Sequence, residues 1–255
     1  MRRLALLCLL VLAGPAMAAT LDREELRVGL GVDDPPFAYV GDTGEVAGFE
    51  VDLVRALCTR LQVRCTFGPT YAQEVLPQLQ GHAVDLVPGL TITESRSREM
   101  DFTEPYHRAP SRFIARRGKP LDPSAGGLRG TIVGVERGSV QDRYVSATYP
   151  AATVRRYGDR TELYLDLALD RLDTVLTDTV AARVQFLGTD LGAEFDFVGP
   201  QLDDPEWFGK GVGIAVSKGD DRLRTALNGA LQAIRGDGTL DAIASQYFPF
   251  PLDGT

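Results

Sequence analysis

Apolar positions in the first half of the chain alternate between short runs and segments of helical period. Residues 26–32, 63–67 and 84–88 are predicted to be strands because each is a short, mostly apolar run. Residues 49–61 carry apolar side chains at the spacing of an amphipathic helix, and residues 72–79 favour a second helix. Strands that alternate with helices predict an α/β fold with a mostly parallel sheet.

The same pattern begins again after residues 105–130, a segment rich in Pro, Gly and Arg. The further strands are predicted at 131–135, 154–157, 174–176 and 211–216, and the further helices at 140–147, 161–169, 179–186, 221–234 and 240–247. Two such series with a break between them predict two lobes.

The N-terminal residues have the pattern of a secretory signal peptide. Arg2 and Arg3 precede the apolar run 4–12, which is too short to span a bilayer, and small residues end at Ala18. We therefore predict that residues 1–18 are removed by cleavage after Ala18. No later stretch is apolar enough to cross a membrane, so a soluble exported protein is expected.

Charge and histidine content exclude some classes of partner. The chain has 27 basic and 35 acidic residues, and loss of the two N-terminal arginines brings the net charge to about −10, which repels phosphate backbones. Nucleic acid is therefore not an expected partner. His82 and His107 have no cysteine or acidic cluster around them at ligand spacing, so we expect no metal site and no cofactor.

Two cysteines, Cys58 and Cys65, remain after the predicted cleavage. An even number in an exported chain favours a disulfide, and a pair of buried free thiols is the alternative. The loop between them is short, so the expected stabilisation is only about 2–3 kcal/mol.

Polar residues mark three places where a predicted strand meets a helix, and open α/β sheets bind ligands at such carboxyl ends. At the first, Gly89 allows close approach of the backbone, and Thr91 adds a hydroxyl. Thr93 is a candidate N-cap, and Arg96 can present a bidentate guanidinium to a carboxylate. These residues predict an anion-binding site; the alternative is an exposed turn with Arg96 as a surface charge.

The other two junctions lie in the second series. Gly138 and Ser139 open a helix whose first N–H groups are exposed, and Asp178 follows the strand at 174–176. Asp178 is either an N-cap or a carboxylate that faces an ammonium group. Because Arg96 and Asp178 fall on different predicted lobes, closure of the lobes would clamp the two charges of an α-amino acid between them.

Several motifs also follow one another in a recognisable order. They are Pro35-Pro36-Phe37, Gly48-Phe49-Glu50-Val51-Asp52-Leu53, the run 89–96 (GLTITESR), the run 101–106 (DFTEPY) and Gly138-Ser139. This set resembles family 3 of the bacterial extracellular solute-binding proteins over about residues 25–250. The resemblance implies a periplasmic-binding-protein type II (venus flytrap) fold, in which two α/β lobes are joined by two hinge strands. Lobe 1 would comprise residues 19–109 and 206–255, and lobe 2 residues 110–205.

The resemblance also implies a function. The expected ligand-binding residues are Gly89, Thr91 and Arg96 for a carboxylate, Asp178 for an ammonium, and Ser139 and Val140 in a loop of lobe 2. A monomer in the periplasm would deliver a free amino acid to an inner-membrane ABC permease, with no catalytic residue. Cys58 and Cys65 are similar to the disulfide of the members that bind histidine or lysine, arginine and ornithine.

The positions expected to contact the ligand's side chain depart from the family's pattern. The loop 31–37 is shorter than in many members and lacks the aromatic residue that often stacks there, so Tyr39 and Tyr71 are candidates instead. Ala72 stands where a large residue is common. Val140 replaces a frequent threonine. Asp33 and Asp34, near the expected cleft mouth, either favour a cationic side chain or belong to a solvated turn before Pro35.

Two other functions stay open at this point. A few relatives of this type act as dehydratases, which need a general acid or base in the cleft. His107 is the candidate, but it lies at the expected crossover and has no visible partner. The second is a sensor or accessory protein for another small carboxylate, which the departures in loop 31–37 and at Ala72 leave open. Glu50 lies in a generic motif and is predicted to be structural.

Overall fold

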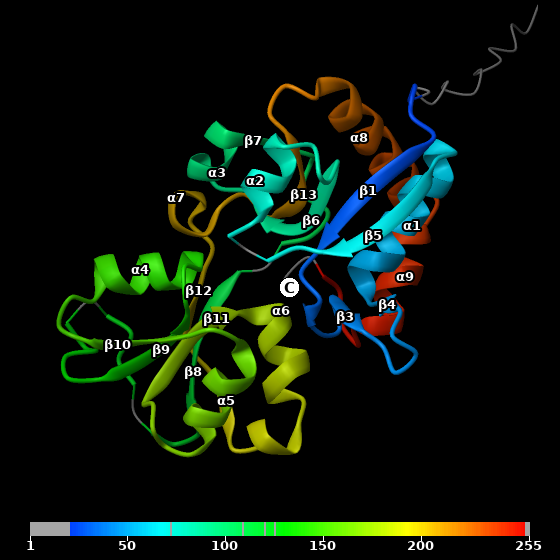
Figure 1. The fold of residues 1–255 in the computed structure, drawn as a ribbon. Helices are drawn as coiled ribbons and strands as arrows, with labels where there is room; N and C mark the ends of the chain where they lie inside the picture. The colour runs from blue at the N-terminus through cyan, green and yellow to red at the C-terminus, as the bar shows by residue number, and fades with distance from the viewer. Residues whose placement is uncertain (1–20, 72, 109, 120, 125, 253–255) are drawn as a thin grey trace, which may run out of the picture.

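The computed structural model describes residues 21–71, 73–108, 110–119, 121–124 and 126–252. Most of these residues form two lobes, each built around a five-stranded sheet (Figure 1). The first sheet, in lobe 1, has the order β5 (Arg64–Pro69), β1 (Glu25–Leu30), β6 (Leu86–Thr91), β13 (Val212–Ser217) and β7 (Met100–Phe102). Strand β1 pairs in parallel with β5 and β6, whereas β13 is antiparallel to both of its neighbours.

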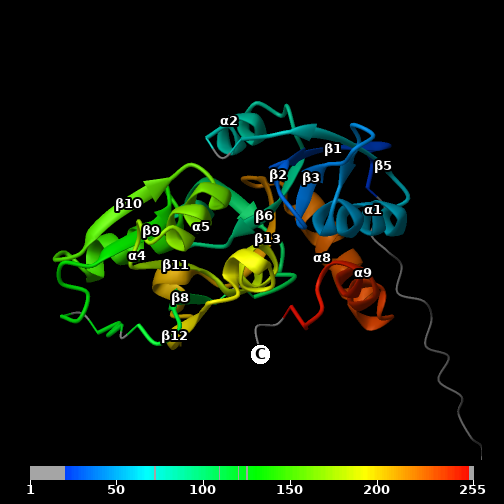
Figure 2. The same cartoon turned by 90° about the horizontal axis from the view of Figure 1, so that it is seen from below.

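The second sheet, in lobe 2, repeats this arrangement. Its order is β10 (Thr153–Tyr157), β9 (Ile132–Glu136), β11 (Thr174–Asp178), β8 (Ser111–Arg116) and β12 (Phe195–Leu202). Strands β10, β9 and β11 are parallel, and β8 is antiparallel to both β11 and β12. The two lobes are also seen as separate bodies when the molecule is viewed from below (Figure 2).

Helices cover both sheets, and a small third sheet lies in lobe 1. The helices of lobe 1 are α1 (Phe49–Leu61), α2 (Val75–Gln80), α3 (Glu94–Glu99), α8 (Asp221–Gly236) and α9 (Thr239–Tyr247). Those that follow lobe 2 strands are α4 (Val140–Thr148), α5 (Arg160–Ala168), α6 (Thr179–Ala182), η1 (Arg183–Leu187), η2 (Asp190–Gly192) and α7 (Pro205–Phe208). The third sheet contains β2 (Asp33–Asp34), β3 (Ala38–Val40) and β4 (Val46–Ala47).

The core of lobe 1 follows from the periodicity of α1 and α8. Leu53 and Leu57 on α1 and Leu227 on α8 are fully buried in one hydrophobic cluster with the inner face of β1. Burial of each such side chain contributes roughly 1.5–3 kcal/mol. The disulfide between Cys58 at the end of α1 and Cys65 in β5 is present, as predicted.

The chain crosses between the lobes twice, from β7 to β8 and from β12 to β13. The two crossings meet where His107 pairs with Val212 in an isolated antiparallel bridge. Val180 and Ala181 of α6, although they follow a lobe 2 strand, are buried in the hydrophobic cluster of lobe 1. The carboxyl end of β11 is therefore held close to lobe 1.

Some expectations about the fold were wrong. Half of the neighbouring strand pairs in the two large sheets are antiparallel, so neither sheet is mostly parallel. The segment 105–130, taken as a break between lobes, contains β8, and β12 was not predicted. The predicted signal peptide lies outside the described residues. Within the described part of the chain, no helix is long and apolar enough to cross a membrane.

Candidate functional site

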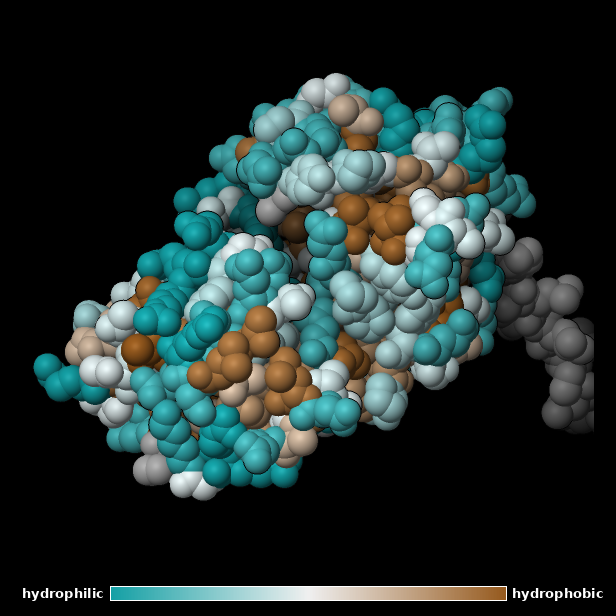
Figure 3. Space-filling view, turned by 60° about the horizontal axis from the view of Figure 1, so that its bottom comes forward, coloured by the Kyte–Doolittle hydropathy of each residue, from teal (hydrophilic) through white to brown (hydrophobic). Residues whose placement is uncertain are grey.

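A cavity of about 1600 Å³ lies between the lobes and is lined from both of them. The space-filling view shows a hollow between the two bodies with hydrophobic and hydrophilic surface around it (Figure 3). Lobe 1 contributes the end of β6 and the start of α3, and lobe 2 contributes the ends of β9 and β11 and the start of α5. Carboxyl ends of strands from both sheets thus face one space, which is where α/β sheets bind ligands.

Arg96 lines this cavity from the first turn of α3. Thr93 caps the helix, as predicted, because its Oγ1 accepts a hydrogen bond of 3.2 Å from the backbone N–H of Arg96. The Arg96 guanidinium donates through Nη1 to the backbone oxygen of Thr91, 3.0 Å away. Among the described residues it forms no ion pair with a carboxylate, and burial, together with the nearby charge of Arg143, lowers its pKa. The guanidinium therefore has N–H groups left for an anion.

Gly89 lies within β6, and its backbone N–H contacts a protein side chain. Its backbone N–H donates to the hydroxyl of Tyr106 at 2.8 Å, and that hydroxyl donates to Oε1 of Glu50, also at 2.8 Å. A Cβ at Gly89 would lie 2.7 Å from both Glu50 carboxylate oxygens, and the residue has a φ of 82°. The glycine thus allows the Glu50 carboxylate to lie directly against the backbone of β6.

Burial dominates the electrostatics of Glu50. The side chain is buried in the lobe 1 core, and loss of solvation raises its pKa from 4.5 to about 7. The hydrogen bond from Tyr106 and the charge of Arg160 oppose this change, whereas the charge of Asp34 adds to it. Glu50 therefore supports β6 at Gly89, through Tyr106, in agreement with a structural role.

Ser139 and Val140 begin α4 on the opposite wall of the cavity. Ser139 is the N-cap, and its Oγ accepts a hydrogen bond of 3.1 Å from the N–H of Asp142. The Asp142 carboxylate in turn accepts from the N–H of Gly138 at 3.1 Å, so this turn is fixed at both ends. Val140 presents an apolar side chain to the cavity.

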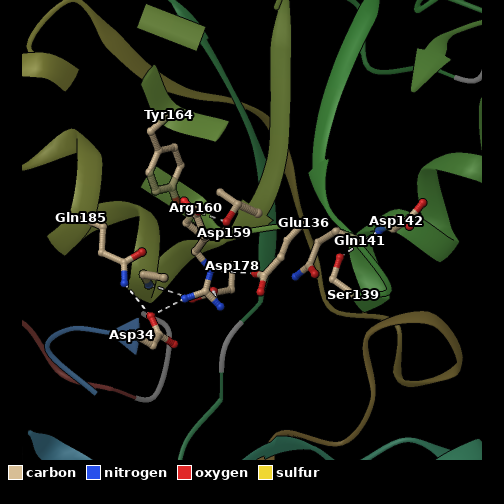
Figure 4. A network of polar contacts seen from close by, with 12 residues as sticks. Asp34, Glu136, Ser139, Gln141, Asp142, Asp159, Arg160, Tyr164, Asp178 and Gln185 are labelled. Carbon is tan, nitrogen blue, oxygen red and sulfur yellow. Dashed lines mark hydrogen bonds and ion pairs between the residues drawn. The ribbon is translucent and has the colours of Figure 1, made fainter. Parts of the chain in front are cut away.

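Asp178 lies at the junction of β11 and α6 and lines the same cavity. It is the N-cap, since its Oδ1 accepts from the N–H of Ala181 at 2.8 Å. Burial raises its pKa, and the positive charge of Arg160, with Nη2 3.9 Å from Oδ2, opposes the rise. The carboxylate therefore caps a helix and also has one oxygen directed toward the polar network of the cleft (Figure 4).

The centre of that network is Arg160, which the sequence did not single out (Figure 4). From the first turn of α5, its Nη1 contacts Oδ1 of Asp34 at 2.7 Å and its Nε contacts Oε2 of Glu136 at 3.0 Å. Oδ1 of Asp34 also accepts from Nε2 of Gln185 at 2.7 Å. Asp34 is thus an ion-pair partner in the cleft, although its side chain is still 39% exposed.

The other predicted positions lie less centrally. Tyr71 lines the cavity but leaves 53% of its surface exposed, so it is not a buried stacking platform. Ala72 lies outside the described residues. His107 is buried against Phe37 and Tyr106, and burial lowers its pKa to about 4. Its ring is therefore neutral and packed, which suits a structural position at the crossing better than acid–base chemistry.

Comparisons with known proteins agree with this architecture. The model of the bacterial extracellular solute-binding proteins, family 3, matches residues 26–250. The chain belongs to this family. It is 38% identical over 258 residues, all of both chains, to an L-arginine-binding protein of Pseudomonas aeruginosa. It is 36% identical to the lysine/arginine/ornithine-binding periplasmic protein of Escherichia coli, with 98% of each chain covered.

The structure is also similar to solved members. An ancestral arginine-binding protein bound to arginine superposes with a TM-score of 0.77 at 32% identity, covering 89% of this chain and 99% of that one. The predicted fold class, two α/β lobes of the type II periplasmic-binding architecture, is therefore confirmed.

Proposed function

We propose that this chain is the periplasmic substrate-binding component of an ABC transporter and that it binds a free amino acid in the cleft between its lobes. The observation that carries the proposal is the Arg96 guanidinium, which lines the cleft and forms no ion pair with a carboxylate among the described residues. A partly buried charge without a counter-charge is costly, and a ligand carboxylate would supply one. The named relatives that bind arginine, lysine or ornithine support the same ligand class.

The two charges of an α-amino acid match the two walls. Arg96 would hold the carboxylate through a bidentate contact, with the Thr91 hydroxyl beside it. Asp178 on the opposite wall would accept the ammonium. A zwitterion bound in this way neutralises a charge on each lobe, so the free energy of binding favours contact with both lobes at once.

Membership of the family supports the remaining parts of the proposal. The predicted signal peptide would place the protein in the periplasm, where an oxidising environment permits the disulfide between Cys58 and Cys65. The partner would be an inner-membrane ABC permease, which receives the amino acid, and the binding protein itself would act as a monomer without catalysing a reaction.

Isothermal titration calorimetry against the twenty amino acids tests the carboxylate site. Removal of one partner from a buried, charge-assisted contact costs about 3 kcal/mol or more, so Arg96→Ala should weaken binding by about 100-fold or more. Arg98→Ala is the matched control, because Arg98 lies on the same helix, is exposed and pairs only with Glu94 among the described residues. Undiminished affinity in Arg96→Ala would refute the proposed site.

A second variant tests the ammonium site separately from the helix cap. Asparagine is as good an N-cap as aspartate, so Asp178→Asn keeps the cap of α6 but removes the charge. We expect this variant to lose affinity for an amino acid and to lose little for the same molecule without its α-amino group. Native mass spectrometry of freshly purified protein identifies the ligand that the cleft retains.

A further inference from the structure

We propose that Arg160 modulates the charge that the cleft accepts on a ligand's side chain: its guanidinium partly neutralises the carboxylates of Asp34, Glu136 and Asp178, so it weakens the binding of cationic side chains relative to uncharged ones. The inference rests on the proposed binding of an amino acid between Arg96 and Asp178, and it names the side-chain class for that same site.

The first step is the position of the guanidinium. Arg160 lines the cavity, and its three nitrogens lie near three carboxylates: Asp34 at 2.7 Å, Glu136 at 3.0 Å and Asp178 at 3.9 Å. Its side chain is only 23% exposed, so the charge lies in a region where electrostatic interactions are stronger than in water. A positive charge therefore stands immediately beside the carboxylate that would hold the ligand's ammonium.

The second step is that the charge of Arg160 is firmly maintained. Burial alone would lower its pKa, but the three carboxylates outweigh that effect and keep the pKa above its ordinary value. Asp159 caps α5 by accepting from the N–H of Glu162 at 2.9 Å, which fixes the first turn from which Arg160 projects. The guanidinium is thus both charged and held in place.

The third step concerns the oxygens that a cationic side chain would need. Oδ1 of Asp34 already accepts from Arg160 and from Gln185, each at 2.7 Å, and Oε2 of Glu136 accepts from Nε of Arg160. Asp34 belongs to β2 of lobe 1, whereas Arg160 and Gln185 follow lobe 2 strands, so these contacts span the cleft (Figure 4). A ligand guanidinium or ammonium would have to compete for Oδ1 of Asp34 and Oε2 of Glu136, and the charge of Arg160 offsets part of the attraction of the three carboxylates.

L-Arginine and L-citrulline form a sharp pair of probes, since they have nearly the same shape and only arginine carries a side-chain charge. Calorimetry gives the ratio of the arginine Kd to the citrulline Kd for the wild-type protein, and the variants are compared with that ratio. In Arg160→Gln, the ratio of the arginine Kd to the citrulline Kd should fall by about tenfold or more, because the carboxylates lose their internal partner. Asp34→Asn should raise the same ratio, because it removes a negative charge and leaves Arg160 in place.

Two controls make the outcome decisive. Arg171→Gln removes a guanidinium from an exposed ion pair with Asp166 on the same lobe, and the ratio should be unchanged in that variant. Arg160→Lys keeps the charge and should keep the ratio close to that of the wild type. Thermal unfolding confirms that each variant is folded, and if Arg160→Gln does not fold, the opposite shift in Asp34→Asn still tests the proposal.

Failure of this inference differs from failure of the proposed function. If Arg96→Ala abolishes binding but the ratio in Arg160→Gln stays within about twofold of wild type, well below the effect expected of a neighbouring charge, the role of Arg160 is refuted and amino-acid binding stands. If Arg96→Ala binds both probes normally, the proposed site itself is wrong.

Discussion

Substitution of Glu50 by glutamine should change how the stability of the protein depends on pH. The carboxyl group is buried against Gly89 of β6, with Tyr106 donating to Oε1, and burial raises its pKa from 4.5 to about 7. Between pH 4.5 and about 7, Glu50 is protonated in the folded protein and ionised in the unfolded chain. Unfolding then releases a proton, and the stability contributed by this group falls as the pH rises from 4.5 to about 7.

The size of the effect follows from the two pKa values. The difference between 4.5 in the unfolded chain and about 7 in the folded protein corresponds to about 3 kcal/mol, all of it lost by pH 8 or so. His107 acts in the opposite direction, because its pKa is lowered from 6.5 to about 4 and its contribution rises with pH over that window. The pH dependences contributed by Glu50 and His107 largely cancel in the wild-type protein. The contribution of Glu50 therefore becomes visible only when the wild type is compared with Glu50→Gln.

The assay is urea unfolding of both proteins at intervals from about pH 5 to about pH 8. Glu50→Gln should match the wild type at the acidic end and become more stable than it by up to about 3 kcal/mol at the alkaline end. Glu45→Gln, at an exposed position of the same lobe, should follow the wild-type curve throughout. Parallel curves for Glu50→Gln and wild type would refute the reasoning, since they would mean that the buried carboxyl titrates as it does in the unfolded chain.

Two further predictions concern stability. Replacement of both Cys58 and Cys65 by serine should lower the free energy of unfolding by about 2–3 kcal/mol, because a short loop is no longer closed in the unfolded chain, and a reductant should have the same effect on the wild type in chemical denaturation. Gly89→Ala should lower the urea midpoint by an amount equivalent to about 2 kcal/mol or more, because an L-residue at a φ of 82° is strained and its Cβ would meet the Glu50 carboxylate. A midpoint within error of wild type would show that the backbone of β6 at Gly89 can move away from Glu50.

Much of the fold was predictable because most elements carry their own local signal. Helices α1 and α8 have long apolar stripes, and the structure has them within a few residues of their predicted ends. Strands β8 and β12 were missed for local reasons. The buried core of β8 is only three residues long and lies in a segment rich in Pro and Arg, and β12 is interrupted by Gly199 and Pro200 with an irregular register.

The candidate site was predictable only in part. Arg96 and Asp178 each stand at a strand-to-helix junction, a position that can be recognised from a few neighbouring residues, and the structure lines one cavity with both. The role of Arg160 could not be predicted in that way, because its partners Asp34 and Glu136 are far away in the sequence. The one local signal for Arg160 was a fourth strand-to-helix junction, where Asp159 and Arg160 follow the strand that ends at Tyr157.

The position of β13 also dictates an order of folding. The sheet of lobe 2 is built from one continuous stretch, residues 111–202. In lobe 1, strand β13 lies between β6 and β7 and is the last strand of that sheet along the chain. Lobe 2 can therefore complete its sheet before β13 has joined the sheet of lobe 1. Pairing β13 with β6 and β7 closes a long loop, which is slow. During that interval the open edges of β6 and β7 are free to pair with other chains. Association between incomplete chains should accordingly begin at lobe 1, and a chain that stops before residue 212 should retain that exposed gap permanently.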